Sequence, residues 1–293
     1  MRKVAIYGQN YIKETTQKAV EKLVEVLIEK QADIYIHREF LDTQFTQVKT
    51  NSKVDTFTSL DSSFDLLISV GGDGTILRAT SYVGDLGIPV VGINTGRLGF
   101  LATIQITDIH RALTEIFNGK CKISERSLLS VTTTPMHNDL LETNFALNEI
   151  AISRKNTTSM ITVETHLNGE FLTSYWADGL ILSTPTGSTG YSLSCGGPVI
   201  APDAKNFALT PIAPHNLSAR PLIIPDSTTV TLKVSGREEQ FLMSLDSRIV
   251  TLSNSTTVTI KKAGFVIKMV ELLDETFLAT LRKKLLWGED RRN

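Results

Sequence analysis

The chain contains 293 residues, of which 41% are apolar and 21% charged, so it is long enough for one large globular domain or two ordinary ones. The net charge of −1 excludes a global electrostatic attraction to nucleic acid or to an anionic membrane. Cys121 and Cys195 lack the spacing of a disulfide framework or a zinc site. Since residues 1–20 lack the apolar core of a signal peptide and no window approaches about 18 uninterrupted apolar residues, we expect a cytoplasmic protein without a membrane span.

The first part of the chain alternates short apolar runs with amphipathic segments, which predicts a Rossmann-like α/β domain with a mostly parallel sheet over residues 1–123. The expected strands cover residues 4–7, 33–36, 66–70 and 89–93, and the expected helices cover residues 12–30, 75–82 and 108–117. Residues 43–63 are rich in Thr and Ser without a clear period, so we expect a mobile connection there and a candidate cover for a site.

Residues 124–270 contain closely spaced segments rich in Thr, Val and Ile, which predict a β-rich domain of two sheets, similar to a sandwich. The expected strands cover residues 128–134, 140–147, 160–167, 170–175, 180–183, 222–224, 229–234, 241–245, 248–252, 256–260 and 266–270. Asn168 and Gly169 form a strong hairpin signal between two of these strands. Residues 271–293 form a third segment, in which an amphipathic helix over 274–286 is expected to pack back on the first domain through Phe277, Leu278, Leu281 and Leu285.

The sequence GGDGT at residues 71–75 stands between a buried strand and a helix, where open α/β sheets bind their ligands. Glycines there let backbone N–H groups approach phosphate closely. Asp73 would repel a phosphate unless a divalent cation stands between them or the carboxylate accepts a proton from a nucleophilic hydroxyl. The alternative is a tight turn with a purely structural aspartate.

Three further stretches are candidates for the same site. NTGRLGF at residues 94–100 also follows a strand of the α/β domain, so it is expected to face the same crevice as GGDGT. Residues 178–191 form a loop rich in hydroxyls and glycine, which suits sugars and phosphates but is also compatible with an ordinary loop. Asn148 and Glu149 are polar in an apolar run, which suits a ribose diol or an adenine edge but also a simple strand end.

Together these stretches resemble the NAD kinase family. The resemblance is carried by GGDGT at 71–75, NTGRLGFL at 94–101, NE at 148–149, DGLILSTPTGSTGYSLSCGGP at 178–198 and PHNLSARPLII at 214–224. GGDG alone is shared with lipid kinases and phosphofructokinase-like enzymes, whereas its combination with TPTGST is specific. The resemblance implies phosphorylation of the adenosine ribose 2′-hydroxyl of NAD by ATP, and a homodimer or homotetramer in which a neighbouring subunit completes the site.

The resemblance also implies a role for individual residues. Asp73 matches the proposed general base, and Mg²⁺ is expected to arrive with ATP rather than in a dedicated protein cage. The phosphate-binding positions are Gly71, Gly72, Gly74 and Thr75. Arg78 is placed to meet a phosphate or to be an ordinary surface arginine, and Phe100 matches an aromatic wall. The contacts to the dinucleotide are Gly74, Asn148, Glu149, Asp178, Thr189, Gly190, Tyr191, Ser192, Leu193 and Ser194, of which Asn148 and Glu149 meet the adenosine half and Tyr191 stacks on a ring.

Three of the expected substrate contacts depart from the family pattern. Gly190 stands where alanine is usual, Trp176 where arginine is common, and Arg248 where glutamine is common. Trp176 and Arg248 leave open how the site distinguishes NAD from NADH and how firmly it holds the new phosphate.

Two alternative functions compete with a NAD kinase. A lipid kinase of the GGDG superfamily would need an acyl channel or a membrane-facing surface, and no basic amphipathic helix indicates one. A non-catalytic dinucleotide sensor would not need a carboxylate in its phosphate turn, so Asp73 argues against it. The sequence does not decide between ATP and polyphosphate as the phosphoryl donor.

Overall fold

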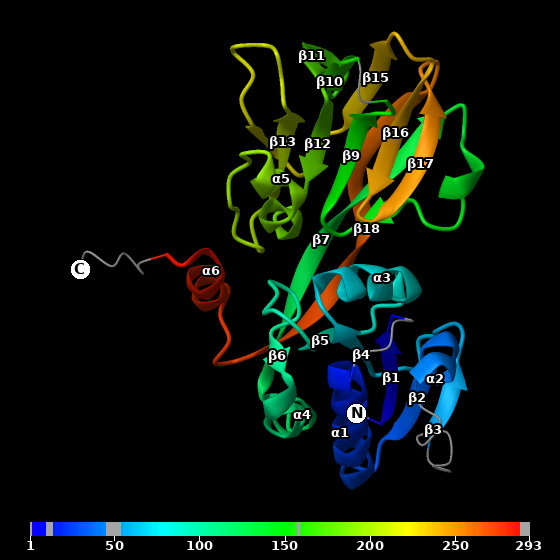
Figure 1. Cartoon of the computed structure of the whole chain (residues 1–293), viewed down its shortest axis with the longest axis vertical. Coiled ribbons are helices and arrows are strands. Elements are labelled where there is room, and N and C mark those ends of the chain that lie inside the picture. The colour runs from blue at the N-terminus through cyan, green and yellow to red at the C-terminus, as the bar shows by residue number, and fades with distance from the viewer. Residues whose placement is uncertain (1, 10–13, 45–53, 157–158, 288–293) are drawn as a thin grey trace. The chain divides into compact units, whose positions relative to one another are not determined.

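The computed structural model of the chain describes residues 2–9, 14–44, 54–156 and 159–287 (Figure 1). The chain divides into two compact units, a first unit of residues 1–125 and 267–293 and a second unit of residues 126–266. The strands β7 (Cys121–Thr134) and β18 (Thr257–Leu272) carry the chain from one unit to the other. The sequence placed the domain boundaries after residues 123 and 270, whereas the two units divide after residues 125 and 266. Within the described ranges, no helix is long and apolar enough to cross a membrane.

The first unit is built on a parallel sheet in the order β3-β2-β1-β4-β5. Its strands are β1 (Lys3–Gly8), β2 (Asp33–His37), β3 (Val54–Phe57), β4 (Leu66–Gly71) and β5 (Val90–Asn94), with β6 (Ile104–Gln105) beside β5. Every residue of β4 and β5 is buried, which explains why their sequences are mostly apolar. Gly71 pairs with Asn94 in the register of these two strands. The two glycine-rich turns therefore start side by side at one edge of the sheet.

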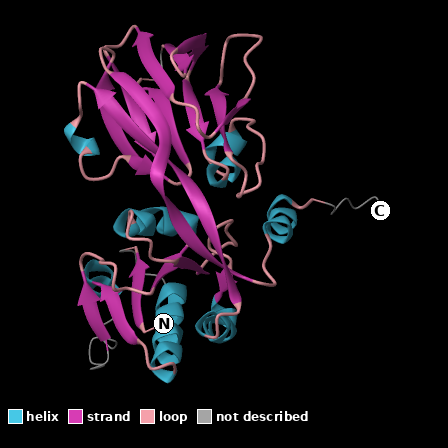
Figure 2. Cartoon of the chain, turned by 180° about the vertical axis from the view of Figure 1, so that it is seen from behind, coloured by secondary structure: helices cyan, strands magenta, loops and turns pink. Residues whose placement is uncertain are grey.

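Helices α1 (Glu14–Glu29) and α4 (Ile109–Phe117) bury their apolar faces in the core of the first unit. Leu23 and Leu27 of α1 share this core with Leu113 of α4 and with strand residues such as Ile68. The helix α3 (Asp73–Val83) begins directly in the glycine turn after β4. Figure 2 distinguishes the helices, in cyan, from the strands, in magenta.

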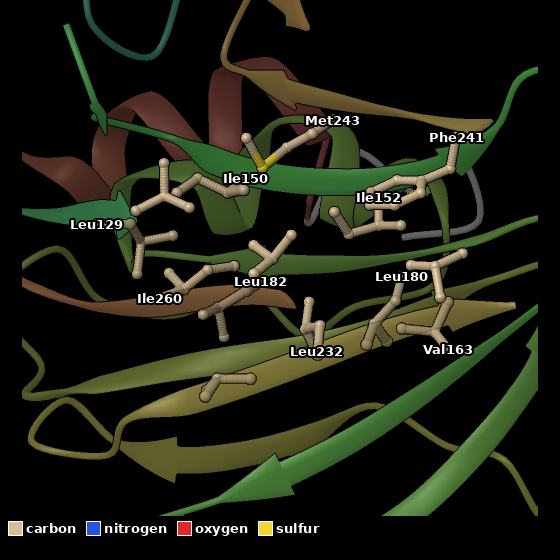
Figure 3. Close-up of a cluster of buried hydrophobic side chains, with 14 of the residues drawn as sticks. Leu129, Ile150, Ile152, Val163, Leu180, Leu182, Leu232, Phe241, Met243 and Ile260 are labelled. Carbon is tan, nitrogen blue, oxygen red and sulfur yellow. The ribbon is translucent and has the colours of Figure 1, made fainter. Parts of the chain in front are cut away.

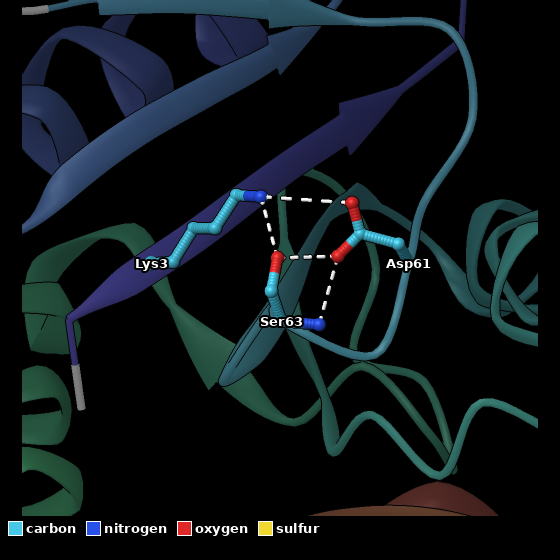
Figure 4. Close-up of polar contacts among 3 residues, drawn as sticks. All are labelled: Lys3, Asp61 and Ser63. Atoms are coloured by element: carbon cyan, nitrogen blue, oxygen red, sulfur yellow. Dashed lines mark hydrogen bonds and ion pairs between the residues drawn. The ribbon is translucent and has the colours of Figure 1, made fainter.

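The loop before β4 is fixed to β1 by polar contacts (Figure 4). Lys3 Nζ donates to Ser63 Oγ at 2.6 Å and lies 3.8 Å from the Asp61 carboxylate. The backbone N–H of Ser63 donates to Asp61 Oδ1 at 2.8 Å. The Asp65 carboxylate accepts the backbone N–H groups of Arg2 and Lys3 at 2.6 and 3.0 Å. These contacts fix where β4 starts beside β1.

The prediction of an unstructured connection over residues 43–63 is wrong in part. Strand β3 lies inside it, paired with β2 from Ile34–Val54 to His37–Phe57, while α2 (Arg38–Gln44) reaches into its start. A four-residue edge strand with two exposed side chains has too short a pattern for its period to be recognised. Residues 45–53, which carry most of the predicted mobile segment, lie outside the described residues.

The tail forms α6 (Phe277–Leu285), a shorter helix than the expected 274–286. Its N-cap is Thr276, whose hydroxyl accepts the backbone N–H of Ala279 at 3.2 Å. Leu281 is buried, but Leu278 is 61% exposed, so the expected apolar face is wrong at that position. The segment packs on the first unit, because Arg111 of α4 binds Asp274 at 2.8 Å and Lys284 donates to the carbonyl oxygen of Leu98.

The second unit consists of two antiparallel sheets. One follows the order β11-β10-β15-β18, with β7 on β18 and β8 on β7, and the other follows β14-β13-β12-β9-β16-β17. The remaining strands are β8 (Phe145–Ala146), β9 (Glu149–Arg154), β10 (Ile161–Leu167), β11 (Glu170–Ala177), β12 (Gly179–Ser183), β13 (Asn206–Ile212), β14 (Leu222–Pro225), β15 (Val230–Gly236), β16 (Gln240–Leu245) and β17 (Arg248–Ser253). Apolar side chains of both sheets form the core, among them Ile152, Leu180, Leu232 and Phe241 (Figure 3).

Several predicted strands of the second unit differ from the structure. The segment 140–147 contains only the two-residue β8, because residues Asn138–Leu140 form a 3-10 helix before it. The two strands expected at 256–260 and 266–270 are one continuous strand, β18. Strands β9 and β13 had no predicted counterpart. Strand β9 begins with the polar Glu149, directly after Asn148, and β13 contains Pro211, which opposes a strand assignment. The expected hairpin is present, with Asn168 and Gly169 both at positive φ, 51° and 86°.

Candidate functional site

The glycine turn after β4 leaves open space at the start of α3. A Cβ added at Gly71 would lie 2.1 Å from Thr75 Oγ1, so this position needs glycine for the turn itself. At Gly72 and Gly74, by contrast, nothing lies within 4 Å of an added Cβ. The turn therefore presents unobstructed backbone at the N-terminus of an eleven-residue helix, where N–H groups and the helix dipole favour an anion.

Asp73 binds the second glycine-rich turn through its carboxylate. Oδ2 accepts the N–H of Phe100 at 2.7 Å, and Oδ1 accepts those of Leu101 and Ala102 at 3.0 and 2.9 Å. Gly99 packs against the same group, because a Cβ there would lie 1.9 Å from Asp73 Oδ1. Of about four lone-pair positions on a carboxylate, three are used, which leaves one for a hydroxyl proton. The sequence predicted either a chemical role or a structural turn for Asp73, but it did not predict these hydrogen bonds to residues 100–102.

The turn over residues 94–102 is held from two further sides. Asn94 is buried and donates from Nδ2 to the carbonyl oxygens of Arg97 and Ala102 at 2.7 and 3.1 Å, while its Oδ1 accepts the N–H of Gly96 at 2.7 Å. The ammonium group of Lys284 lies 5.6 Å from the centre of the Phe100 ring. Phe100 is thus partly buried, with its ring fixed next to a cation and its N–H on Asp73.

Arg78 is exposed on α3, one turn after the glycines. Burial raises the pKa of both Tyr7 and Tyr82, whose rings lie 5.0 Å apart, and the nearby positive charge of Arg78 opposes this rise in part. Burial is the larger effect and raises the pKa of Tyr7 to about 12. Thr75 is buried and its hydroxyl accepts a hydrogen bond from Gln9 Nε2 at 3.1 Å.

Asn148 directly precedes β9 in the second unit, and Glu149 is the first residue of that strand. Each carries a buried polar side-chain atom. Asn148 Oδ1 and Glu149 Oε2 have no hydrogen-bond partner among the described residues, although Glu149 is only 8% exposed. Buried polar atoms are rarely left unpaired, so these two mark a place for a polar ligand. Gly187 packs on the same segment, since an added Cβ would lie 2.0 Å from the carbonyl oxygen of Asn148.

The loop after β12 contributes Gly190 and Tyr191 to this place. An added Cβ on Gly190 would lie 3.1 Å from Glu149 Oε2 and 3.4 Å from Asn148 Nδ2, and the backbone N–H of Tyr191 donates to Glu149. The Tyr191 ring is exposed, as are parts of Leu193 and Ser194. Other hydroxyls of the loop serve the fold, because Thr189 Oγ1 donates to Thr186 O at 3.2 Å and Ser192 Oγ lies 2.9 Å from Thr210 Oγ1.

The remaining predicted contacts of the second unit, Trp176, Asp178 and Arg248, each have neighbours within that unit. Trp176 is 52% exposed on the edge strand β11, with its ring 5.2 Å from that of His215. Asp178 forms an ion pair with Arg154 at 3.0 Å. The Arg248 guanidinium donates to the backbone carbonyls of Thr143 and Phe145. The structure therefore gives Arg248 a role in fixing the start of β8, while its expected contact with substrate stays a prediction.

Asp246 was not among the predicted site residues, although it stands two positions before Arg248. It lies in the turn between β16 and β17 with φ 52°, and its carboxylate accepts the N–H groups of Leu147, Asn148 and Glu149. Burial, with a further contribution from the Asp246 charge, raises the pKa of Glu149 to about 8. The signal in the sequence is the position of Asp246 two residues before Arg248, which was itself a predicted contact.

Comparison with known proteins shows to which family the chain belongs. Models of the ATP-NAD kinase N-terminal domain and the ATP-NAD kinase C-terminal domain match residues 3–121 and 147–272. The chain belongs to the ATP-NAD kinase family. The NAD kinases of Flavobacterium johnsoniae and Christiangramia forsetii are 54% and 55% identical to it, over 99% of this chain and 100% of each relative.

Solved structures of the ATP-NAD kinase family agree with the fold. Yeast NADH kinase complexed with NADH superposes with a TM-score of 0.83 at 25% identity, over 99% of this chain and 89% of that one. An NAD kinase from Archaeoglobus fulgidus in complex with ATP gives 0.75 at 25% identity, over 98% and 99%. The expected α/β part with a mostly parallel sheet and the β-rich part are confirmed, and so is the assignment to kinases of this family rather than to lipid kinases or sensors.

Proposed function

We propose that this chain transfers the γ-phosphoryl group of ATP to the adenosine ribose 2′-hydroxyl of NAD, with Asp73 as the general base. Phosphorylation of NAD to NADP with ATP is the activity of the family to which the chain belongs. The observation that carries the proposed role of Asp73 is its position, a carboxylate among open glycine backbone at a helix N-terminus. A ribose hydroxyl is a weak nucleophile at neutral pH, so a carboxylate that takes its proton accelerates attack on the phosphorus.

The three N–H groups on Asp73 support this role in two ways. They hold the carboxylate in one orientation, so that little reorganisation is needed when the proton moves. They also leave one lone-pair position free for the incoming hydroxyl. In the proposal, the open backbone at Gly72 and Gly74 receives phosphate oxygens, and Arg78 supplies a positive charge one helical turn away.

In the second unit, we assign Asn148 and Glu149 to the adenosine half of NAD. Both have a buried side-chain atom without a partner in the described structure, as expected for atoms that bind a ligand. The exposed ring of Tyr191 next to them offers a face for stacking on a base.

A divalent cation such as Mg²⁺ is part of the proposal as a companion of ATP. When bound, it would neutralise charge on the transferring phosphoryl group. The donors present fit a cation carried by the triphosphate, because the Asp73 oxygens already accept the N–H groups of Phe100, Leu101 and Ala102. The test is NADP formation from NAD and ATP with and without Mg²⁺. NADP formed equally well in excess chelator would contradict this part.

Trp176 is expected to weaken the hold on the phosphate of NADP, because it places an exposed ring where the family commonly has an arginine. Converting Trp176→Arg should tighten NADP binding by about 1 kcal/mol, the scale of one charge-assisted hydrogen bond, or roughly fivefold in Kd. Calorimetric titration with NADP measures it. Trp176→Leu removes the ring without adding charge and serves as the control. Equal affinity of the arginine and leucine variants would show that position 176 does not meet the phosphate.

We also propose that the chain works as a homo-oligomer in the cytoplasm. The second unit exposes large apolar side chains on or beside edge strands, namely Phe171, Trp176, Leu217 and Ile223. Such side chains favour burial against a second copy of the chain. Both cysteines are free, which agrees with a reducing compartment.

Light scattering on the purified protein should give the mass of a dimer or tetramer, and specific activity should fall when the protein is diluted below the dissociation constant. A monomeric mass together with undiminished activity at nanomolar concentration would contradict the oligomer.

A further inference from the structure

Asp246 is bound to residues 147–149 in both directions. Its Oδ2 accepts the N–H of Leu147 at 2.9 Å, and its Oδ1 accepts those of Asn148 and Glu149 at 2.8 and 3.2 Å. In return, the backbone N–H of Asp246 donates to the carbonyl oxygen of Glu149 at 3.0 Å. Four hydrogen bonds thus connect the β16–β17 turn to the segment that carries the two unpartnered atoms. The left-handed φ of 52° at Asp246 shows that the turn adopts an uncommon backbone conformation in doing so.

Asp246 and Glu149 are two neighbouring acids, and their hydrogen bonds decide which one is ionised. Burial raises the pKa of Asp246, whereas the three N–H groups that face its two oxygens act in the opposite direction. These donors stabilise a carboxylate and leave no acceptor for a carboxylic proton on Asp246. Glu149 Oε2 is buried without a partner in the described chain, so ionising Glu149 would place a second negative charge there. The other groups that face this pair are Arg248 toward Asp246, and Tyr191 and Cys195 toward Glu149. At neutral pH the pair therefore holds one proton, on Glu149.

We propose that Asp246 is a positioning residue whose ionised carboxylate fixes the 147–149 segment and keeps a proton on Glu149, so that Glu149 binds the adenosine end of the dinucleotide as a hydrogen-bond donor. The partner of this donor is an acceptor atom, such as a ribose oxygen or an adenine ring nitrogen. The inference rests on the proposed role of Asn148 and Glu149 in binding NAD. It adds the protonation state of the site and the residue that sets it.

The raised pKa of Glu149 makes the binding of NAD dependent on pH. The pKa of Glu149 lies above the ordinary value of a glutamic acid, at about 8, so the donor is present below that pH and lost above it. The value of kcat/KM for NAD should therefore fall as the pH rises through about 8. Removing the negative charge at Asp246 makes Glu149 easier to ionise. In Asp246→Asn the fall should move to lower pH by about one unit, the scale of one nearby charge.

The experiment measures kcat/KM for NAD between pH 6 and 10 in four proteins: the wild type, Asp246→Asn, Glu149→Gln and Asp203→Asn. Glutamine donates from its amide at every pH, so Glu149→Gln should show no fall near pH 8 while its kcat/KM at pH 7 is lowered less than about tenfold. Asp203 is an exposed acid of the same unit, and its variant should retain the wild-type profile.

A fall that stays at its wild-type pH in Asp246→Asn, with kcat/KM lowered equally at every pH, would overturn the proposal and leave Asp246 as a merely structural residue. Persistence of the fall in Glu149→Gln would also overturn it. If Asp246→Asn does not fold, a ¹³C NMR titration of the wild type, with the Glu149 signal assigned from Glu149→Gln, decides the question. A midpoint near 8 supports the proposal, and an ordinary acidic midpoint overturns it. A wild type that forms no NADP contradicts the proposed function instead, which keeps the two failures distinct.

Discussion

Replacing Asp73 with asparagine is expected to lower kcat by about 10²–10⁴-fold, the usual contribution of a general base, while the KM for NAD changes little. Asparagine keeps the shape of the side chain but accepts no proton at neutral pH. The measurement is the steady-state rate of NADP formation over a range of NAD concentrations. Retention of more than about a tenth of the wild-type kcat would contradict the base.

The same substitution also acts on the fold. Asparagine has one oxygen, so its Nδ2 would face at least one of the N–H groups of Phe100, Leu101 and Ala102 that now donate to the carboxylate. We expect a loss of about 1–3 kcal/mol in the free energy of unfolding, as for buried donors that lose their acceptor. A fall in kcat alone therefore does not separate the chemical role from the structural one.

Gly99→Ala provides the matched control. Its Cβ would lie 1.9 Å from Asp73 Oδ1, so it disturbs the same contact between Asp73 and the turn but retains the carboxylate. If Asp73 is the base, Gly99→Ala should retain much more activity than Asp73→Asn at equal loss of stability. Equal kcat values in the two variants would assign Asp73 to the fold. A role in holding Mg²⁺ gives a third result, because activity of Asp73→Asn would then recover in part as Mg²⁺ is raised.

Gly187→Ala is expected to destabilise the protein by about 3 kcal/mol and to raise the KM for NAD. The added Cβ would lie 2.0, 2.4 and 2.7 Å from the carbonyl oxygen, carbonyl carbon and Cα of Asn148. The neighbour is backbone rather than the end of a flexible side chain, so one of the two segments must move, and overpacking of this kind costs about 1–3 kcal/mol. Displacing Asn148 moves the atoms assigned to adenosine. Denaturant unfolding and NAD saturation curves measure the two effects.

Gly264→Ala is the control for the change of glycine to alanine itself. Gly264 lies in β18, and an added Cβ meets nothing within 4 Å. Its variant should have the stability of the wild type or slightly more, since alanine reduces the freedom of the unfolded chain. Equal stability of the Gly187 and Gly264 variants would show that residues 187 and 148 are less closely packed than the structure has them.

Much of the fold could be predicted from the sequence because its signals are local. The runs around Ile68 and Ile93 are buried on both faces and are mostly apolar. Asn168 and Gly169 adopt the positive φ angles that their residue types favour. Strand β3 and strand β13 were missed because a short edge strand and a proline-containing strand are defined by their neighbours along the ladder, Ile34 and Leu182, which lie far away in the sequence.

The candidate site could be predicted only as a set of motifs. Glycines and a carboxylate in GGDGT indicate phosphate chemistry through residue type and spacing alone. The hydrogen bonds of Asp73 to residues 100–102 and of Asp246 to residues 147–149 join positions 27 to 29 and 97 to 99 apart in the sequence, so no local pattern indicates them. The hydrogen bonds of Arg248 to the carbonyl oxygens of Thr143 and Phe145 likewise join distant positions, and no local pattern indicates them either.

The central claim is the transfer of a phosphoryl group from ATP to the adenosine ribose 2′-hydroxyl of NAD. The most direct measurement incubates the purified chain with NAD, Mg²⁺ and ATP labelled in its γ-phosphate, then isolates the dinucleotide and supplies it to an NADP-specific dehydrogenase. The account predicts label in a dinucleotide that this dehydrogenase reduces. Label recovered only as inorganic phosphate, or in a dinucleotide that the dehydrogenase does not accept, would contradict the account.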